Sequence, residues 1–548
     1  MASAVFAAAL FSITVVLFAS TVVREKRKIS ATREKIKNNF GSAEDTIRDP
    51  SQFENIPYLF NKLSKETAFG HIIDDITVSD LGLSDLYARV NRCVTSPGED
   101  MLYCMFRIQG DDGVIRDYIR GFLKDPEKAV RLLYILDRYG RHKDCDDLEM
   151  ILSLSRAKTK STSLLLLPLA GLVLSVILIS VLPVYGFAAL IIMIVVCIWS
   201  YFAGKRDMDD NLRGLALALK LIACCKELLT EGCTEFTAFK DMFRLLNGKF
   251  LIPFKDKSAV DPLSILSDYV RMITHIDLIA YNIKVSGIKK YVDKLGMLYV
   301  MIGKTDAALA LTSYLMKKKH CEAVLTDDCA IDAKAMYHPL VKNAVTNDLH
   351  SVRGMILTGS NASGKSTFLK ATGINVLFAQ SFGFAFADSF ETGRFSVYTS
   401  MALADNLLGE ESYYVVEARS IKRICDAAAK GLTLCIIDEV LRGTNTIERI
   451  AASSRILKSL CIPNVLCYAA THDVELARLL EDDMDLYHFT EEIHEDNVTF
   501  PFIIQKGYSE KTNAIRLLSM LGFGDDIVSS ADALVASYRK TGKWVKEK

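Results

Sequence analysis

The sequence predicts two kinds of structure: a helical part that contains membrane-spanning segments, and a C-terminal α/β domain with a mostly parallel sheet. Three observations predict this fold class. Two uncharged apolar runs are long enough to cross a bilayer. Apolar residues recur at helical spacing from about 70 to 160 and from 207 to 340. From about residue 349, short β-rich runs at 355–357, 434–437, 465–469 and 498–504 alternate with helices.

Composition sets broad limits on the class of protein. The 548 residues are enough for two or three domains. Lys plus Arg equals Asp plus Glu at 66 each, so the overall charge neither supports nor excludes contact with DNA. The 13 cysteines form no Cys-x-x-Cys pair and several lie in apolar runs. We expect them to be reduced core residues of a cytosolic protein.

The first apolar run predicts a transmembrane anchor over residues 1–23. It is uncharged and is closed by the basic cluster 24–28, and a juxtamembrane linker follows over 24–69. A cleaved signal peptide is the alternative. We disfavour it because no positive charge precedes the run and the basic cluster comes after it.

The second apolar run predicts a transmembrane helical hairpin over 163–203. The break at Leu182-Pro-Val-Tyr-Gly186 divides it into two helices of about 17 to 20 residues each. A buried pair of core helices is the alternative, but about 40 residues pass without an ionisable group. The hairpin separates two parts of a helical core, 70–162 and 204–345. Basic residues on both flanks place 24–162 and 204–548 in the cytoplasm, as a three-span protein of the inner membrane.

A glycine-rich stretch follows the strand that begins at Met355. Its spacing, Gly-x-x-x-x-Gly-Lys-Ser, predicts a P-loop: backbone N–H groups and a helix N-terminus surround phosphate oxygens, the lysine reaches the outer phosphates, and the serine hydroxyl binds Mg²⁺. A glycine turn without a ligand is the alternative. The predicted nucleotide-binding residues are Gly359, Ser360, Asn361, Ala362, Ser363, Gly364, Lys365, Ser366 and Thr367.

Two further strands end in polar side chains that suit the same chemistry. The strand at 434–437 delivers Asp438 and Glu439. We expect Asp438 to hold Mg²⁺ together with Ser366, and Glu439 to orient or deprotonate the water that attacks the γ-phosphate. The strand at 465–469 leads to His472, a candidate to stabilise that phosphate. Surface acids and a structural histidine are the alternatives.

These motifs resemble, in order and spacing, the ATPase domain of the MutS mismatch-repair family. The matching segments begin at Thr358, Asp438 and Ala470, and Ala404–Glu417 is similar to the family's signature segment, with Ser412 and Glu417 in the matching places. The resemblance implies an ABC-type ATPase domain over 346–548 with a C-terminal helical dimerisation segment. It implies ATP and Mg²⁺ as cofactors, and a homodimer in which Ser412 caps the γ-phosphate bound by the partner subunit.

The chain also departs from the family's pattern. A membrane anchor stands where the family has its mismatch-reading domain, and Arg516 stands in the C-terminal stretch where the family usually has Ser-Tyr-Gly-Ile-His; contact of Arg516 with adenine is in doubt. We expect a membrane-anchored MutS-like ATPase coupled to mismatched, branched or damaged DNA. The alternative is an ATP-gated membrane switch or transporter-like module with no DNA substrate.

Overall fold

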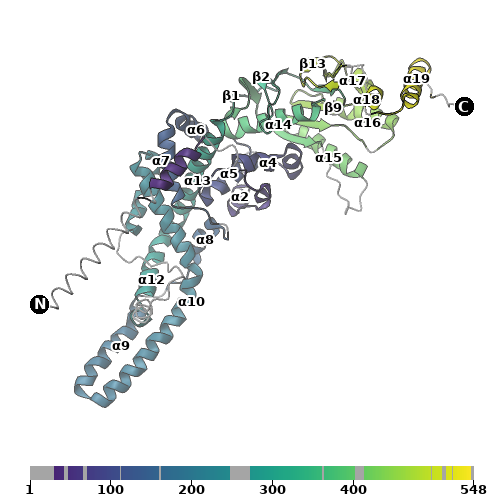
Figure 1. Cartoon of the computed structure of the whole chain (residues 1–548). Coiled ribbons are helices and arrows are strands. Elements are labelled where there is room, and N and C mark those ends of the chain that lie inside the picture. The colour runs from purple at the N-terminus through teal and green to yellow at the C-terminus, as the bar shows by residue number, and fades with distance from the viewer. Residues whose placement is uncertain are drawn as a thin grey trace.

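The computed structural model describes residues 27, 30–41, 47–65, 71–110, 113–142, 144–159, 162–246, 272–360, 363–401, 413–442, 444–494, 497–508, 514–520, 522–542 and 544. The molecule is elongated (Figure 1): an apolar helical hairpin forms one end, a helical body forms the middle, and an α/β part forms the other end. The predicted anchor at 1–23 lies outside the described residues.

The helical body is built mainly from short helices around one long buried helix, α13. Asp74, Thr95, Asp125 and Asp146 begin four of the helices, because each side chain accepts a hydrogen bond from a backbone N–H of the first turn. The bounds are η1 (Pro50–Glu54), α2 (Tyr58–Leu63), α3 (Asp75–Leu81), α4 (Leu83–Val90), α5 (Ser96–Arg107), α6 (Val114–Lys124), α7 (Pro126–Asp137), α8 (Asp147–Ser153), η2 (Leu154–Arg156), η3 (Thr234–Leu246), α12 (Ile276–Ile288), η4 (Lys289–Tyr291) and α13 (Val292–Leu315).

Helices α5 and α13 meet at a close contact that requires glycine. A Cβ atom on Gly98 would lie 2.1 Å from Oδ2 of Asp306, and one on Gly303 would lie 2.5 Å from the carbonyl oxygen of Pro97. The close approach lets the buried Asp306 carboxylate accept hydrogen bonds from the backbone N–H (2.8 Å) and hydroxyl (2.6 Å) of Thr95. This junction ties the start of α5 to the middle of α13.

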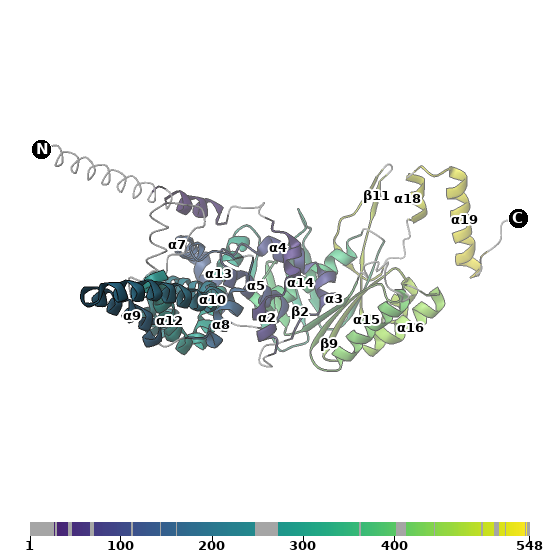
Figure 2. The ribbon, with the colours of Figure 1, turned by 90° about the horizontal axis from the view of Figure 1, so that it is seen from below.

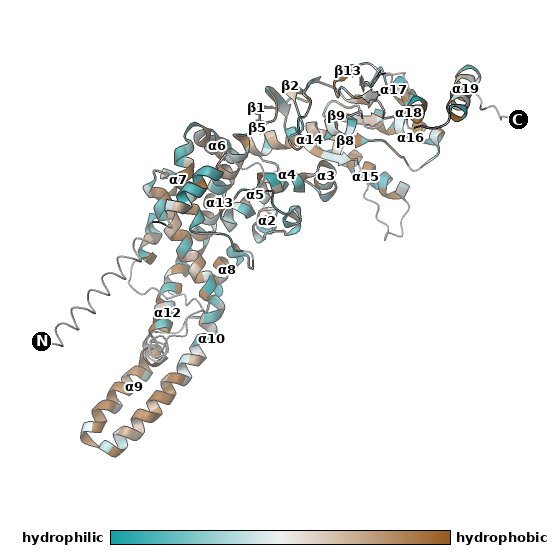
Figure 3. Cartoon of the chain, viewed as in Figure 1, coloured by the Kyte–Doolittle hydropathy of each residue, from teal (hydrophilic) through white to brown (hydrophobic). Residues whose placement is uncertain are grey.

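The predicted hairpin is formed by α9 (Thr162–Val181) and α10 (Pro183–Thr230). In Figure 3 the ribbon of both arms of the hairpin is mostly brown, the colour of hydrophobic residues. Pro183 begins α10, which then runs without interruption for 48 residues into the helical body, where it packs against α8, η3 and α12. The helices α9 and α10 lie side by side in both views (Figure 2).

Two helical stretches among the described residues are long and apolar enough to cross a membrane. Pro183–Arg206 has a mean hydropathy of 2.3, and only 17% of its most apolar stretch is buried. Ile276–Leu315 has a mean hydropathy of 1.2 and is 78% buried, as expected for a core helix. The other arm of the hairpin supplies a shorter apolar helix, Leu165–Val181. Length and apolar character alone do not assign a membrane.

The α/β part contains two larger sheets. The six-stranded sheet has the order β13-β10-β4-β9-β8-β7, with β13 antiparallel and the other neighbours parallel, and the five-stranded sheet has the order β3-β2-β6-β1-β5. The mostly parallel sheet predicted from the sequence is therefore confirmed. The strand bounds are β1 (Cys321–Thr326), β2 (Ile331–Met336), β3 (Asn347–Ser351), β4 (Met355–Thr358), β5 (Phe384–Ala385), β6 (Ser389–Gly393), β7 (Ser396–Ser400), β8 (Thr433–Asp438), β9 (Val465–Thr471), β10 (Asp485–Phe489), β11 (Glu492–His494), β12 (Asn497–Thr499) and β13 (Ile504–Lys506).

Helices cover both faces of the six-stranded sheet (Figure 2). Leu434 and Ile436 of β8 face the core that contains α14, whereas Cys435 and Ile437 face the core that contains α15 and α16. Burial on both faces explains why these strands are continuous apolar runs. The helices are α14 (Lys365–Phe382), α15 (Tyr413–Ala428), α16 (Thr446–Ser459), α17 (Val474–Leu479), α18 (Ala514–Met520) and α19 (Asp525–Thr541).

Two details of the predicted secondary structure are wrong. Helical structure was expected as far as about residue 340, but β1 and β2 occupy 321–336. A single strand was expected over 498–504, but the chain forms β12 and β13 with Phe502 between them at a φ of +57°. The left-handed Phe502 interrupts the extended backbone between the two strands.

Candidate phosphate-binding site

The glycine-rich loop lies at the carboxyl edge of the six-stranded sheet, between β4 and α14. Gly359 has a φ of +147° and Gly364 a φ of +106°, conformations that L side chains rarely adopt. A Cβ atom on Gly359 would also lie 2.9 Å from Oγ of Ser363 and 3.0 Å from the carbonyl oxygen of Phe489. The two glycines therefore allow the loop to curl over the N-terminus of α14, where backbone N–H groups are free to bind an anion.

Lys365 is the first residue of α14 and is buried, and its ammonium group turns back into the loop. Its Nζ donates hydrogen bonds of 2.8 Å to the carbonyl oxygens of Gly359 and Ser360. Burial lowers the pKa of Lys365 to about 8, while the charges of Asp438 and Glu439 act in the opposite direction. The loop thus holds a partly desolvated cation at the place where phosphate would bind.

Asp438 ends β8, two strands away from the loop. Its Oδ2 accepts a hydrogen bond from the hydroxyl of Ser366, which is exposed. A hydroxyl and a carboxylate side by side are oxygen ligands that suit Mg²⁺, which usually binds one or two carboxylates together with phosphate and water. Among the described residues, no group of three or more His, Cys, Asp and Glu side chains is placed to hold a metal ion.

Glu439 is held between two basic side chains. Its Oε1 lies 3.0 Å from Nε2 of His472, and its Oε2 lies 2.8 Å from Nε of Arg442. The hydrogen bond with His472, aided by the charge of Arg442, lowers the pKa of the Glu439 carboxyl below its usual value despite its partial burial. His472 follows β9 and also lies 3.4 Å from Nζ of Lys365. The parallel strands β4, β8 and β9 therefore bring Lys365, Glu439 and His472 together.

The turn after β8 is strained and is secured from α15. Glu439 and Leu441 have φ values of +61° and +57°, which are uncommon for residues other than glycine. The turn is fixed by two hydrogen bonds: Nη2 of Arg442 donates to the carbonyl oxygen of Asp438 (2.8 Å), and the backbone N–H of Arg442 donates to Oε1 of the buried Glu417 (3.2 Å). Strain of this kind often marks functional sites.

The remaining predicted residues differ in their burial and in whether the structure describes them. Ser363 is fully buried in the loop, and Thr367 is exposed on α14. Asn361, Ala362 and Ser412 lie outside the described residues. Arg516 is exposed on α18 and is not among the described residues that line the cavity beside the loop.

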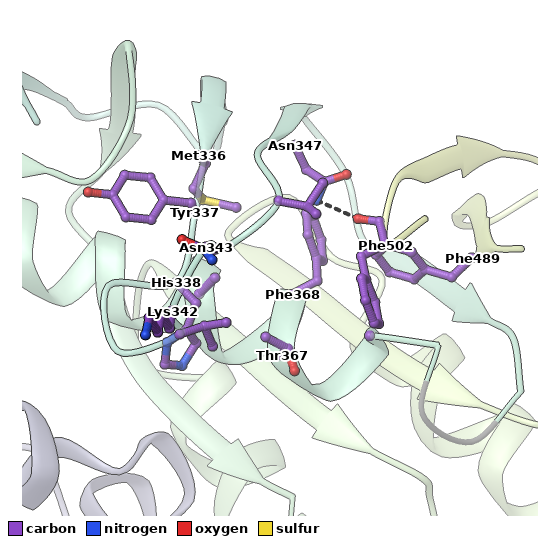
Figure 4. Close-up of a pocket in the computed structure, with 15 residues that line it drawn as sticks. Met336, Tyr337, His338, Lys342, Asn343, Asn347, Thr367, Phe368, Phe489 and Phe502 are labelled. Carbon is purple, nitrogen blue, oxygen red and sulfur yellow. Dashed lines mark hydrogen bonds between the residues drawn. The ribbon is translucent and has the colours of Figure 1, made fainter. Parts of the chain in front are cut away.

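That cavity was not predicted from the sequence. It has a volume of about 230 Å³ and lies between the loop, the segment 336–347 and the segment that carries Phe502 (Figure 4). Its wall contains the rings of Phe368, Phe489 and Phe502. Asn347 fixes the last of these, because its side chain donates to the carbonyl oxygen of Phe502 (3.0 Å) and accepts from the N–H of Ile504 (2.8 Å). Neither periodicity nor spacing in the sequence marks these residues, which come from separate segments of the chain.

The fold and the site together define a class: a mostly parallel α/β domain in which a glycine-rich strand–loop–helix unit lies next to a pair of carboxylates, an arrangement that suits phosphate binding. Comparison with known proteins finds a similarity over this part of the chain. Residues 355–539 match the model of MutS domain V. The chain is 28% identical over 250 residues to the DNA mismatch repair protein MutS of Persephonella marina, a match that covers 44% of this chain and 29% of that protein. It is 29% identical over 209 residues to MutS of Thermus thermophilus, covering 37% and 26%.

MutS 1 of Halobacterium salinarum is 28% identical over 251 residues, covering 44% of this chain and 28% of that protein. Over residues 355–539, the chain is thus similar to domain V of the MutS family. The matches span less than a third of the length of these relatives.

Proposed function

We propose that the protein is a MutS-like ATPase that binds ATP with Mg²⁺ and hydrolyses it. The observation that carries the proposal is the convergence of Lys365, Asp438 and Glu439, from two strands of one parallel sheet, around the glycine-rich loop. These are the parts that phosphoryl transfer requires: a cradle for the phosphates, a metal ligand and a group that positions water.

Each residue has a distinct role in the proposed reaction. Lys365 would exchange its hydrogen bonds to the carbonyl oxygens of the loop for phosphate oxygens. Ser366 and Asp438 would hold Mg²⁺, which supplies charge neutralisation at the phosphates. The lowered pKa makes the Glu439 carboxylate a weak base, so its contribution lies mainly in orienting the attacking water. His472 lies close enough to both Glu439 and Lys365 to stabilise the γ-phosphate.

The cavity beside the loop is suited to the nucleoside of ATP. It adjoins Gly364 and Thr367 at the start of α14, and aromatic rings form part of its wall. Aromatic side chains bind nucleobases by stacking. We therefore assign the base to the cavity lined by Phe368, Phe489 and Phe502.

ATP binding and hydrolysis could drive one of two processes. The first is an action on DNA, which is supported by the relatives, since they are named DNA mismatch repair proteins; we expect a homodimer to carry it out. A membrane-linked switch is supported by the hairpin: Trp199, Tyr185 and Val184 are at least 70% exposed on it, and α10 runs directly from it into the helical body. We place the hairpin in the inner membrane and the ATPase domain in the cytoplasm, and we expect Ser412 to act across the dimer.

Nucleotide binding by the full chain in detergent tests the proposal. Lys365→Ala should abolish binding of Mg²⁺-ATP, because the variant lacks the ammonium group that would contact the outer phosphates. Lys430→Ala, an exposed lysine at the end of α15, is the matched control and should bind as the wild type does. Equal binding by the Lys365→Ala variant and the wild type would refute the assignment of the loop.

A DNA-binding experiment distinguishes an action on DNA from a membrane-linked switch. If the phosphate backbone is a ligand, the detergent-solubilised protein should retard duplex or branched DNA, with an affinity that falls steeply as salt increases. Absence of retardation at low salt would favour the membrane-linked switch.

A further inference from the structure

The inference concerns Glu491, a carboxylate on the side of the loop opposite to Asp438 and Glu439. In the six-stranded sheet, β4 lies between β9 and β10 and is parallel to both. The carboxyl ends of parallel strands meet at one edge. Thr358 pairs with His488, so the residues after each strand, Ser360 and Glu491, are brought to the same place.

The side chains of Ser360 and Glu491 are in direct contact. The hydroxyl of Ser360 donates a hydrogen bond of 2.7 Å to Oε2 of Glu491. The preceding residues are also close: a Cβ atom on Gly359 would lie 3.0 Å from the carbonyl oxygen of Phe489. The end of β10 is therefore packed directly on the glycine-rich loop, and Glu491 belongs to the wall of the site.

The position of Lys365 shows which end of the loop this is. Its Nζ bonds to the carbonyl oxygens of Gly359 and Ser360, both at 2.8 Å. The lysine of such a loop reaches the β- and γ-phosphates. The Glu491 carboxylate thus lies at the end of the loop that would receive the outer phosphates, whereas the base cavity lies at the other end, beside Gly364 and Thr367.

We propose that Glu491 is a specificity-determining residue that lowers the affinity of the site for nucleoside triphosphate relative to diphosphate. The proposal rests on the proposed function, because it assumes that nucleotide binds in this loop. A fixed negative charge repels the γ-phosphate more strongly than the more distant phosphates that a diphosphate also carries. The free protein is accordingly biased toward the diphosphate, and ATP loading must overcome this repulsion.

Glu491→Gln tests the proposal, since the amide oxygen of glutamine can still accept the hydrogen bond from Ser360 while the charge is removed. The full chain in detergent is titrated with a non-hydrolysable ATP analogue and with ADP, each with Mg²⁺. We expect the affinity for the ATP analogue to rise about fivefold and that for ADP to change less than about twofold. The wild-type preference for ADP should also weaken as salt is added, because salt screens the charge.

Glu481→Gln is the matched control, because Glu481 is an exposed carboxylate in the turn before β10. It should leave the ratio of the two affinities unchanged. An unchanged ratio in Glu491→Gln, or weaker binding of the ATP analogue, would overturn the inference and leave the proposed function standing. If the wild type binds neither nucleotide, the proposed function itself fails.

Discussion

At the scale of the residue, the main feature of the site is a lysine ammonium that is almost completely shielded from solvent. Lys365 is 5% exposed, and burial brings its pKa down to about 8. Without nucleotide, its ammonium group donates hydrogen bonds to two carbonyl oxygens of the loop. A phosphate that replaces these oxygens brings full negative charge, so the bound nucleotide should raise the pKa of Lys365 again.

This coupling predicts how nucleotide affinity depends on pH. Below pH 7 Lys365 is protonated both free and bound, so its charge contributes no pH dependence. Above about pH 8 the free protein loses the proton, binding must take it up, and affinity should fall by as much as tenfold per pH unit. Titration of the full chain with Mg²⁺-ATP from pH 7 to 9.5 measures this.

Lys365→Arg is the control for the pH profile, since a guanidinium stays protonated over the whole range. It should flatten the profile, even if its different shape lowers the affinity. A wild-type affinity that is constant from pH 7 to 9.5 would contradict the account of Lys365.

Sequence reasoning proposes those candidate site residues that lie in short, local patterns. Gly359 to Ser366 and the pair Asp438 and Glu439 are local patterns at strand ends, and the structure brings the described members together. The ion pair of Glu439 with Arg442 could not be predicted, because it depends on positive φ values at Glu439 and Leu441. Nor could Glu491, which reaches the loop only through the pairing of β10 with β4.

At the scale of the element, α3 fastens the helical body to the edge strand β7 of the large sheet. The buried carboxylate of Asp80 accepts hydrogen bonds from the hydroxyl of Thr399 (2.7 Å) and the N–H of Met401 (2.9 Å). Asp74, which caps α3, forms an ion pair with Arg423 of α15. The helix thereby contacts both β7 and α15, the elements on either side of residues 402–412 in the chain.

Removal of the Asp80 carboxylate should loosen β7 locally. Asp80→Ala leaves the Thr399 hydroxyl and the Met401 N–H without this acceptor in a buried place, at a cost of about 2 kcal/mol. Hydrogen exchange measured by mass spectrometry should show faster exchange of the backbone amides at 396–401. Asp85→Ala, an exposed acid in the first turn of α4, should leave exchange there unchanged. Equal exchange in Asp80→Ala and the wild type would show that α3 does not secure the strand.

The elements that could be predicted are those with a strong local signal. The strands β4, β8 and β9 are apolar runs buried on both faces, and the sequence marks them clearly. Strands such as β3, Asn347-Asp-Leu-His-Ser351, carry polar residues on an exposed face and have too weak a pattern to be recognised. The hydrogen bond between Thr399 and Asp80, which links β7 to α3, joins residues about 320 positions apart in the sequence. No local sequence pattern could therefore predict it.

At the scale of the whole molecule, one continuous helix links the apolar hairpin to the helical body. The sequence predicted the two arms of the hairpin from their length and the break at Leu182–Gly186. Helical structure after the hairpin was predicted, but not that it continues the second arm as one helix to Thr230, although the charged residues that follow Gly204 include no proline to end a helix. A rigid helix of this kind can carry displacement from one end of the molecule to the other.

The proposed placement of the hairpin in the membrane predicts the sidedness of its ends. A cysteine in place of Tyr185, which is 70% exposed at the tip, should react with a membrane-impermeant maleimide added outside intact cells. A cysteine in place of Asp209, exposed on α10 beyond the basic flank, should react only after permeabilisation. The native cysteines are buried or half-buried and set a low background. Labelling of both positions in intact cells, or of neither, would contradict the placement.

The central proposal is that the domain similar to MutS domain V hydrolyses ATP with the help of Glu439. It is tested most directly by single-turnover hydrolysis of Mg²⁺-ATP by the wild type and by Glu439→Gln, with nucleotide binding measured on the same samples. The account predicts that Glu439→Gln binds ATP but hydrolyses it at least about a hundredfold more slowly, since the group that orients the attacking water is lost. Hydrolysis by Glu439→Gln at the wild-type rate would contradict the account.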